Sequence, residues 1–236
     1  MYQKESITVA FMIQQLRERV EVEIESVNRV DEERDVTESN LHRPGLALAG
    51  YVDLFTHQRV QILGNTEHRF IRHLPDEKQA SAFDNLTQFD VPCIIGTDGN
   101  VLPDRLVDMA TDEEIPVYRT DVPTVEFMAS LRAFLEDQFA PQCSVHGSLV
   151  DVYGIGLLLI GKPGIGKSEV ALDLVERGHR LVADDVIIAT RRDEQILMGS
   201  GTDLVQHFME VRGLGLVDIR AMFGIRAIRF QKRVEV

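Results

Sequence analysis

IGLLLIGKPGIGKSEV, residues 155–170, joins an apolar run to a glycine-rich segment and then to helix-forming residues. The apolar run, Ile155–Ile160, predicts a buried strand, and residues 169–176 predict a helix. Between them, Gly161–Ser168 fits the pattern G-x-x-x-x-G-K-[ST]. This pattern, placed between a strand and a helix, is typical of a loop that holds phosphate groups. The segment therefore predicts a nucleotide or pyrophosphate site, and it does not name the reaction.

The residue types of this loop explain how it would hold an anion. We expect its three glycines to adopt positive φ, so that the backbone curls around a phosphate without a Cβ in the way. The amides would then point inward, and the start of the helix would add positive partial charge. The lysine would contact the β- and γ-phosphates, and the serine hydroxyl would coordinate Mg²⁺. The predicted phosphate-binding residues are Gly161, Lys162, Pro163, Gly164, Ile165, Gly166, Lys167 and Ser168.

The composition of the whole chain limits the classes of function. The 236 residues suggest one large domain or two of ordinary size. A formal net charge of −13 argues against nucleic-acid binding through a broad basic face. Cys93 and Cys143 are far apart in the sequence, as expected of two reduced thiols. Neither a signal-peptide pattern nor an apolar run long enough to cross a bilayer is present, so we expect a cytoplasmic protein that does not bind membranes.

The first part of the chain, residues 1–140, alternates strands with helices. Thr8–Arg17 predicts a first helix, and Val20–Val27 predicts a half-exposed strand. The later elements are strands at Val60–Leu63, Val91–Ile95 and Ile115–Arg119 and helices at Pro75–Gln88, Pro103–Thr111 and Pro123–Phe139. A proline at the start of each of these helices suits its fixed φ and missing donor. The alternation predicts a parallel sheet with helices on its faces, in a domain for assembly or regulation.

The second domain is predicted over residues 141–236, after a linker at Ala140–Ser144. It opens with an alternating strand at Val145–Tyr153, before the strand of the phosphate loop. After the loop helix, a short strand at Arg180–Ala183 is expected to end at Asp184 and Asp185, and strand is expected to continue over Val186–Thr190. A carboxylate at that place would hold Mg²⁺, and a neighbouring one would accept a proton from an attacking hydroxyl. Because adjacent residues on a strand face opposite sides, we expect two different roles, or a solvated turn without either role.

Two weaker signals lie elsewhere in the second domain. A single histidine beside a turn, such as His146, is more often structural than catalytic. Glu210 and Arg212 flank a glycine-containing segment, which indicates either a flexible loop with a metal-binding carboxylate or a solvated ion pair.

Several motifs in order resemble the HPr kinase/phosphorylase family. They are His146–Gly154 (HGSLVDVYG), Gly161–Glu169 (GKPGIGKSE), Gly178–Asp185 (GHRLVADD) and Met209–Asp218 (MEVRGLGLVD). Leu41–Leu46 (LHRPGL) and the α/β pattern resemble the first domain of the family more loosely. Two departures are visible: Pro163 stands where the family often has serine, and the family continues with further C-terminal helices beyond the position that matches Val236.

The resemblance implies a bifunctional enzyme of carbon catabolite regulation. ATP or pyrophosphate would phosphorylate a serine of HPr, a carrier of the phosphotransferase system, and inorganic phosphate would remove the group and yield pyrophosphate. The fold implied is an N-terminal parallel α/β domain followed by a P-loop domain that is similar to phosphoenolpyruvate carboxykinase, in a homohexamer. The implied roles are the β-phosphate contact for Lys167, Mg²⁺ binding for Ser168, Asp184 and Glu210, general base and acid for Asp185, and an active-site role for His146.

Two other functions remain compatible with the residues alone. One is a small-molecule kinase or carboxykinase-like enzyme on the same scaffold, which would need no protein substrate. The other is a nucleotide sensor without catalytic turnover, which would use the first domain to bind a regulator.

Overall fold

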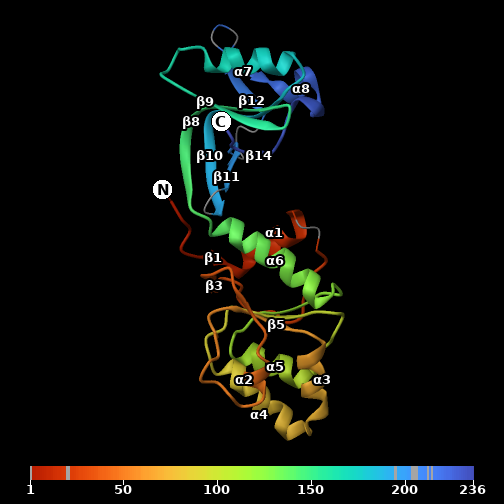
Figure 1. The fold of residues 1–236 in the computed structure, drawn as a ribbon. Coiled ribbons are helices and arrows are strands. Elements are labelled where there is room, and N and C mark those ends of the chain that lie inside the picture. Colours follow the sequence, from red (N-terminus) through yellow and green to blue (C-terminus); the bar gives the residue numbers. More distant parts are fainter. Residues whose placement is uncertain (1, 20–21, 194–195, 203–206, 212, 214) are drawn as a thin grey trace. The chain divides into compact units, whose positions relative to one another are not determined.

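The structure is a computed structural model that describes residues 2–19, 22–193, 196–202, 207–211, 213 and 215–236. It is a mixed α/β protein (Figure 1) that divides into two compact units. We call Lys4–Phe139 the N-terminal unit, and Ala140–Val236 together with Tyr2 and Gln3 the C-terminal unit. Each unit has a sheet and helices of its own.

The N-terminal unit is built on a five-stranded sheet in the order β2-β7-β6-β5-β4. Strands β4 (Leu41–His42), β5 (Val60–Leu63), β6 (Ile94–Gly96) and β7 (Val117–Arg119) are parallel, and β2 (Glu25–Ser26) pairs with β7 as an antiparallel edge. Every residue of β5 and β6 is buried, as expected of parallel strands that are covered on both faces. The predicted parallel sheet is therefore confirmed. A separate antiparallel pair joins β1 (Ile7–Thr8) to β3 (Asp35–Val36).

The described helices of this unit are α1 (Val9–Arg19), α2 (Gly45–Leu48), α3 (Asn65–His73), α4 (Asp76–Thr87), α5 (Asp104–Asp112) and α6 (Thr124–Gln138). A proline is the N-cap residue of α4, α5 and α6, as predicted. Helix α3 was not predicted, because its buried face contains Glu67 and His68 beside Ile71 and therefore lacks an apolar period. The predicted strand at Val20–Val27 is wrong in extent, since among its described residues only Glu25 and Ser26 form β2.

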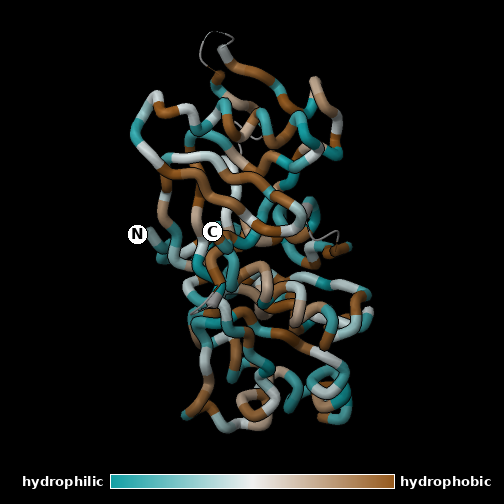
Figure 2. The backbone as a smooth tube through the Cα atoms, turned by 45° about the horizontal axis from the view of Figure 1, so that its top comes forward, coloured by the Kyte–Doolittle hydropathy of each residue, from teal (hydrophilic) through white to brown (hydrophobic). Residues whose placement is uncertain are grey.

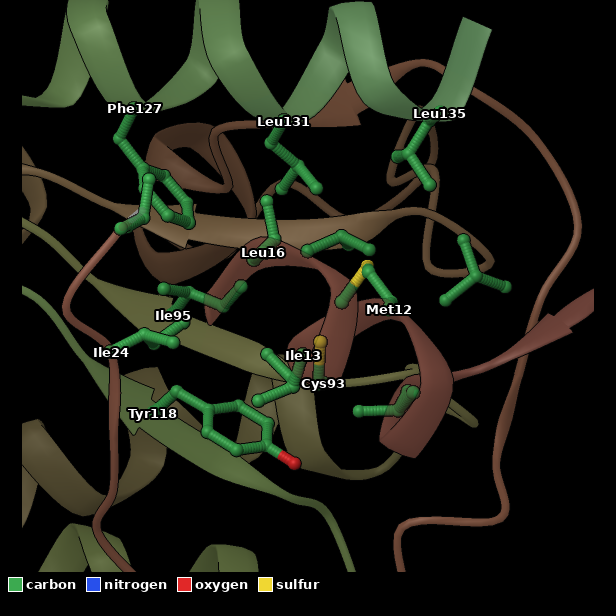
Figure 3. Close-up of a cluster of buried hydrophobic side chains, with 14 of the residues drawn as sticks. Met12, Ile13, Leu16, Ile24, Cys93, Ile95, Tyr118, Phe127, Leu131 and Leu135 are labelled. Atoms are coloured by element: carbon green, nitrogen blue, oxygen red, sulfur yellow. The ribbon is translucent and has the colours of Figure 1, made fainter. Parts of the chain in front are cut away.

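Two hydrophobic clusters cover the two faces of this sheet. In one cluster, side chains of α1 such as Met12 and Leu16 meet Leu131 and other residues of α6 (Figure 3). Cys93 lies in this cluster as a free, buried cysteine, and burial raises the pKa of its thiol. The second cluster packs α2, α4 and α5 against the other face, where Leu63 alternates with Ile62 of the first cluster. This unit therefore has a complete core of its own.

The C-terminal unit has a five-stranded antiparallel sheet in the order β14-β11-β10-β8-β9. Its strands are β8 (Gln142–Val152), β9 (Ile155–Ile160), β10 (Arg180–Asp193), β11 (Ile196–Ser200) and β14 (Gln231–Arg233). Helix α7 (Lys167–Glu176) packs on one face of the sheet through a cluster that includes Val150, Ala171 and Met209. An antiparallel pair of β12 (Phe208–Val211) and β13 (Gly215–Asp218), followed by α8 (Ile219–Phe223), joins the same cluster.

Two predictions about this unit are wrong. The expected linker at Ala140–Ser144 is mostly strand, because Gln142–Ser144 pair with β10. The strands that were expected at Arg180–Ala183 and Val186–Thr190 are both present, but the expected interruption at Asp184 and Asp185 is not, because β10 runs without a break from Arg180 to Asp193. Hydropathy alternates repeatedly along the chain (Figure 2), and within the described residues no helix is both long and apolar enough to cross a membrane.

Candidate active site

The glycine-rich loop connects β9 to α7, as the sequence predicts. Gly164 has a φ of 77° and Gly166 a φ of 100°, so both occupy the left-handed region that glycine adopts without steric cost. Helix α7 begins directly after Gly166, and no side chain caps it. The first amides of α7 are therefore free to bind an anion.

The expectation of positive φ at Gly161 is wrong, because the φ of this residue does not lie in the left-handed region. A Cβ added at Gly161 would lie 3.2 Å from Cγ2 of Ile165, within the same loop. Gly161 is thus restricted by close packing inside the loop, whereas Gly164 and Gly166 provide the turn.

Lys167 is folded over the loop that precedes it. Its Nζ donates to the carbonyl oxygens of Gly161 at 3.3 Å and Lys162 at 3.4 Å. These hydrogen bonds hold a positive charge next to the free amides at the start of α7. The loop therefore combines backbone donors with the full charge of Lys167, the combination that binds polyphosphates.

Asp184 is the central buried acid of the site, with 5% of its surface exposed. Its Oδ1 accepts hydrogen bonds from Ser148 Oγ at 2.5 Å and Ser168 Oγ at 3.2 Å. Its Oδ2 accepts from the backbone amide of Glu210 at 3.3 Å. One carboxylate therefore connects strand β8, helix α7 and strand β12.

Ser148 is a site residue that the sequence reasoning missed. It is fully buried in β8 and lies opposite Asp184 in the register of β8 and β10. The available signal was its spacing from His146, because residues i and i+2 of a strand share one face.

Asp185 differs from Asp184 in both conformation and exposure. Its φ is 64°, and 71% of its side chain is exposed. The nearest basic group recorded for it is His146, whose Nδ1 lies 3.9 Å from Asp185 Oδ1. The expectation that the two aspartates face opposite sides is wrong, since the left-handed backbone at Asp185 interrupts the strand alternation and both line one cavity.

That cavity has a volume of about 520 Å³ and brings most of the predicted site residues together. It is lined by His146, Gly147, Gly161, Pro163, Gly164, Lys167, Ser168, Asp184, Asp185 and Glu210. Gly166 lines a second cavity of about 490 Å³, which shares Lys167, Ser168 and Glu210 with the first. The side chains of Lys162 and Ile165 are exposed and line neither cavity. Arg212, the other residue of the predicted Glu–Arg pair, lies outside the described residues.

Oxygen donors suited to magnesium meet in this cavity. Ser168 Oγ and Asp184 Oδ1 are 3.2 Å apart, and Glu210 also lines the cavity. Mg²⁺ usually takes one or two protein carboxylates and completes its shell with phosphate oxygens and water. Across the described ranges, no group of three or more His, Cys, Asp or Glu residues could hold a metal ion. The donors present therefore fit an ion that is shared with a bound phosphate.

Comparison with known proteins gives matches over nearly the whole chain. The family HPr Serine kinase N terminus matches residues 7–135, and the HPr Serine kinase C-terminal domain matches residues 137–236. The HPr kinase/phosphorylase of Chloroherpeton thalassium is 56% identical over 99% of this chain and 69% of its own length. That of Prosthecochloris aestuarii is 53% identical over the same shares of each chain.

A solved structure, the HPr(Ser) kinase/phosphatase from Coxiella burnetii, is 33% identical. The match covers 39% of this chain and 56% of that chain, with a TM-score of 0.38. The two family matches and the curated relatives agree with the motifs around the cavity, and the chain belongs to the HPr kinase/phosphorylase family.

Proposed function

We propose that this chain transfers a phosphoryl group from ATP or pyrophosphate to a serine hydroxyl of HPr. In the reverse reaction, inorganic phosphate would attack the phosphoserine and leave as pyrophosphate. The observation that carries this proposal is the single cavity lined by the phosphate loop and by both aspartates. Phosphoryl transfer depends mainly on positioning and charge neutralisation, and these residues provide both.

The loop would hold the phosphoryl donor. The amides at the start of α7 and the Lys167 ammonium group would contact the β- and γ-phosphates. Among the described residues, Lys167 Nζ is hydrogen-bonded to two loop carbonyls at 3.3 and 3.4 Å, and it would exchange these weak hydrogen bonds for stronger charge-assisted ones. Ser168, Asp184 and Glu210 would hold Mg²⁺, which would neutralise charge on the phosphate oxygens.

Asp185 is the better of the two aspartates for proton transfer. Asp184 already accepts three hydrogen bonds, so little of its carboxylate is left for a substrate hydroxyl. Asp185 is exposed, and the ion pair recorded for it within the described part of the chain is with His146 Nδ1 at 3.9 Å. As the serine oxygen bonds to the phosphorus and the bond to the leaving oxygen breaks, the serine proton would pass to Asp185, and in phosphorolysis Asp185 would return it.

The test is incubation with HPr, ATP and magnesium, followed by intact-mass measurement of HPr for one added phosphate. Lys167→Ala should abolish the transfer, because the loop loses its only full charge aimed at the phosphates. An HPr variant without the acceptor serine controls for unspecific labelling. Nucleotide binding without any transfer would favour the sensor, and transfer to metabolites but not to HPr would favour the small-molecule kinase.

Three further features remain predictions from the family resemblance. They are homohexameric assembly, a cytoplasmic location and the likeness of the nucleotide domain to phosphoenolpyruvate carboxykinase. The same mass measurement with pyrophosphate in place of ATP would test the second donor separately.

A further inference from the structure

The C-terminal unit contains another polar cavity, of about 350 Å³, that shares no lining residue with the phosphate-loop cavities. It is lined by the β8–β9 turn, by residues that follow α7, by the start of β10 and by Arg229. Helix α7 has ten residues and starts at Lys167, so the loop and this cavity lie at opposite ends of a helix about 15 Å long. The proposed reaction leaves the cavity unused.

The charge of this cavity is unlike that of the chain. Three arginines, Arg177, Arg180 and Arg229, line it together with one acid, Asp151, whereas the whole chain has a net charge of −13. The cavity is therefore lined by more positive than negative side chains. A concave surface of one sign concentrates the electrostatic field and attracts a counter-ion.

Structural pairing accounts for two of the arginines. Arg229 Nη1 donates to the buried Asp151 Oδ2 at 2.6 Å, and Asp151 Oδ1 accepts from the amide of Gly154 at 2.8 Å. Arg177 follows the C-terminus of α7 and pairs with Asp173 at 2.9 Å, as cations commonly do at helix ends. Arg180 has no ion pair with any residue that the structure describes, so its charge is available to a ligand.

His179 gives a second, independent observation. It is 9% exposed and lines the cavity, yet its ring makes no hydrogen bond with any described residue. Its recorded ring contact is with Tyr153, edge to face at 4.6 Å between centroids. Neither of its ring nitrogens is among the described buried atoms that lack a partner, so both remain accessible to a ligand in the cavity. Helix-end charge pairing explains neither His179 nor Arg180.

We propose that this cavity binds the phosphate group of a small phosphate monoester. Arg180 and the free donors of Arg177 and Arg229 would bind the oxygens, because guanidinium groups match phosphate geometry. His179 would supply one further hydrogen bond, and Tyr153 would cover the bound group. The volume exceeds that of a phosphate ion alone, which favours a monoester over the free ion. This proposal does not depend on the chemistry proposed at the phosphate loop.

The chain offers a direct reporter for this cavity. It contains no tryptophan, and Tyr153 is 91% exposed, so Tyr153→Trp places a single emitting tryptophan at the cavity without disturbing a core. Inorganic phosphate and glycerol phosphate are titrated at constant ionic strength against potassium chloride. We expect a saturable change in emission, tighter for glycerol phosphate. Arg180→Gln in the same background should weaken it by about tenfold or more, because a charge-assisted hydrogen-bond pair is lost.

Two variants in the same background serve as controls. Lys167→Ala removes the charge of the phosphate loop and should leave the midpoint unchanged, as should Arg226→Gln, which removes an exposed arginine outside the cavity. Emission that does not saturate, a midpoint unaffected by Arg180→Gln, or a midpoint shifted by Lys167→Ala would each overturn the proposal. The His179 ring resonance of the unsubstituted chain, assigned with His179→Gln, repeats the test without the tryptophan.

Discussion

At the scale of single residues, two neighbouring aspartates have different surroundings. Substituting one should lower the reaction rate, and substituting the other should lower stability. Asp184 is buried and accepts three hydrogen bonds, and Asp185 is exposed in a left-handed conformation. The residues alone placed both near the phosphate loop and predicted two different roles, and only the family resemblance assigned those roles to one aspartate or the other. Only the backbone of β10 shows which one is held by the protein and which one is open to a substrate.

Asp185→Asn should lower the rate of HPr phosphorylation by roughly a hundredfold or more, because the amide cannot accept the serine proton. Its thermal unfolding should be close to that of the wild type, since the replaced side chain is mostly solvated. The measurement is a rate by intact mass together with a melting curve. Near-normal turnover would show that Asp185 is not the base.

Asp184→Asn, the matched change at the next residue, should instead reduce the free energy of unfolding. Hydrogen bonds to a buried charged group contribute about 1.5–3 kcal/mol each, and an amide oxygen replaces them poorly. Urea unfolding of the C-terminal unit measures the loss. If Asp184→Asn and Asp185→Asn had the same free energy of unfolding, the hydrogen bonds of Asp184 would not contribute to stability.

At the scale of elements, the segment around the phosphate loop was predicted correctly, and the strand pairing of the C-terminal unit was not predicted. The β9–loop–α7 segment is contiguous in sequence, so its glycines and apolar run were sufficient to predict it. Strand was predicted on both sides of Asp184 and Asp185, but its unbroken course through them depends on pairing with β8, whose partner residues are more than thirty positions away. Ser148 was missed for the same reason, because its link to Asp184 exists only once the two strands pair.

The phosphate loop offers a prediction about its glycines. Gly166→Ala should destabilise the C-terminal unit by about 1–2 kcal/mol, since the left-handed region is costly for a residue with a Cβ. Gly161→Ala should cost less, because its φ is ordinary and the added Cβ meets only the movable Ile165 side chain at 3.2 Å. Urea unfolding compares the two, and equal losses would contradict the difference in backbone conformation described here.

His68, a buried residue of helix α3, should make the stability of the protein depend on pH. Burial lowers the pKa of His68 below its ordinary value of 6.5, against the effect of its hydrogen bond to the Gly64 carbonyl. Below about pH 6.5, His68 becomes protonated in the unfolded chain but stays neutral in the folded chain, because its folded pKa is lower. The unfolded state then binds more protons, so stability is fully present above this pH and decreases as the pH falls towards the lowered folded pKa.

Urea unfolding of the N-terminal unit at pH 7.5 and 5.5 tests this effect. The wild type should lose more stability on acidification than His68→Gln, by at most about 1.4 kcal/mol per pH unit. His73→Gln, at an exposed position of the same helix, should behave like the wild type. Parallel behaviour of His68→Gln and the wild type would exclude His68 as the source of the acid sensitivity.

At the scale of the whole molecule, the two units have separate hydrophobic cores. The candidate site is lined entirely by residues of the C-terminal unit. A defect in the core of the N-terminal unit should therefore change stability without changing the affinity for nucleotide. The sequence predicted two α/β parts because each has its own run of elements, and the antiparallel order of the second sheet was not evident from them.

Leu131→Ala removes a fully buried side chain of α6 and should destabilise the N-terminal unit by about 2–5 kcal/mol. Calorimetric titration with ATP and magnesium, at a temperature where both units are folded, should give an unchanged dissociation constant. Val125→Ala, at an exposed position of the same helix, should stay within about 0.5 kcal/mol of the wild type. A weaker affinity in Leu131→Ala alone would show that the units are energetically coupled.

The isolated bridge between Tyr2 and Gln142 has a consequence for protein engineering. Each residue donates its amide to the carbonyl of the other at 2.7 Å, so Gln3 and Pro141 stand on facing segments of backbone. The N-terminal unit, Lys4–Phe139, is inserted between Gln3 and Ala140, so its two connections to the C-terminal unit lie next to each other. A short reverse turn spliced from Gln3 to Pro141 should therefore close the gap, and the excised form would reveal what the N-terminal unit adds to the proposed phosphotransfer site.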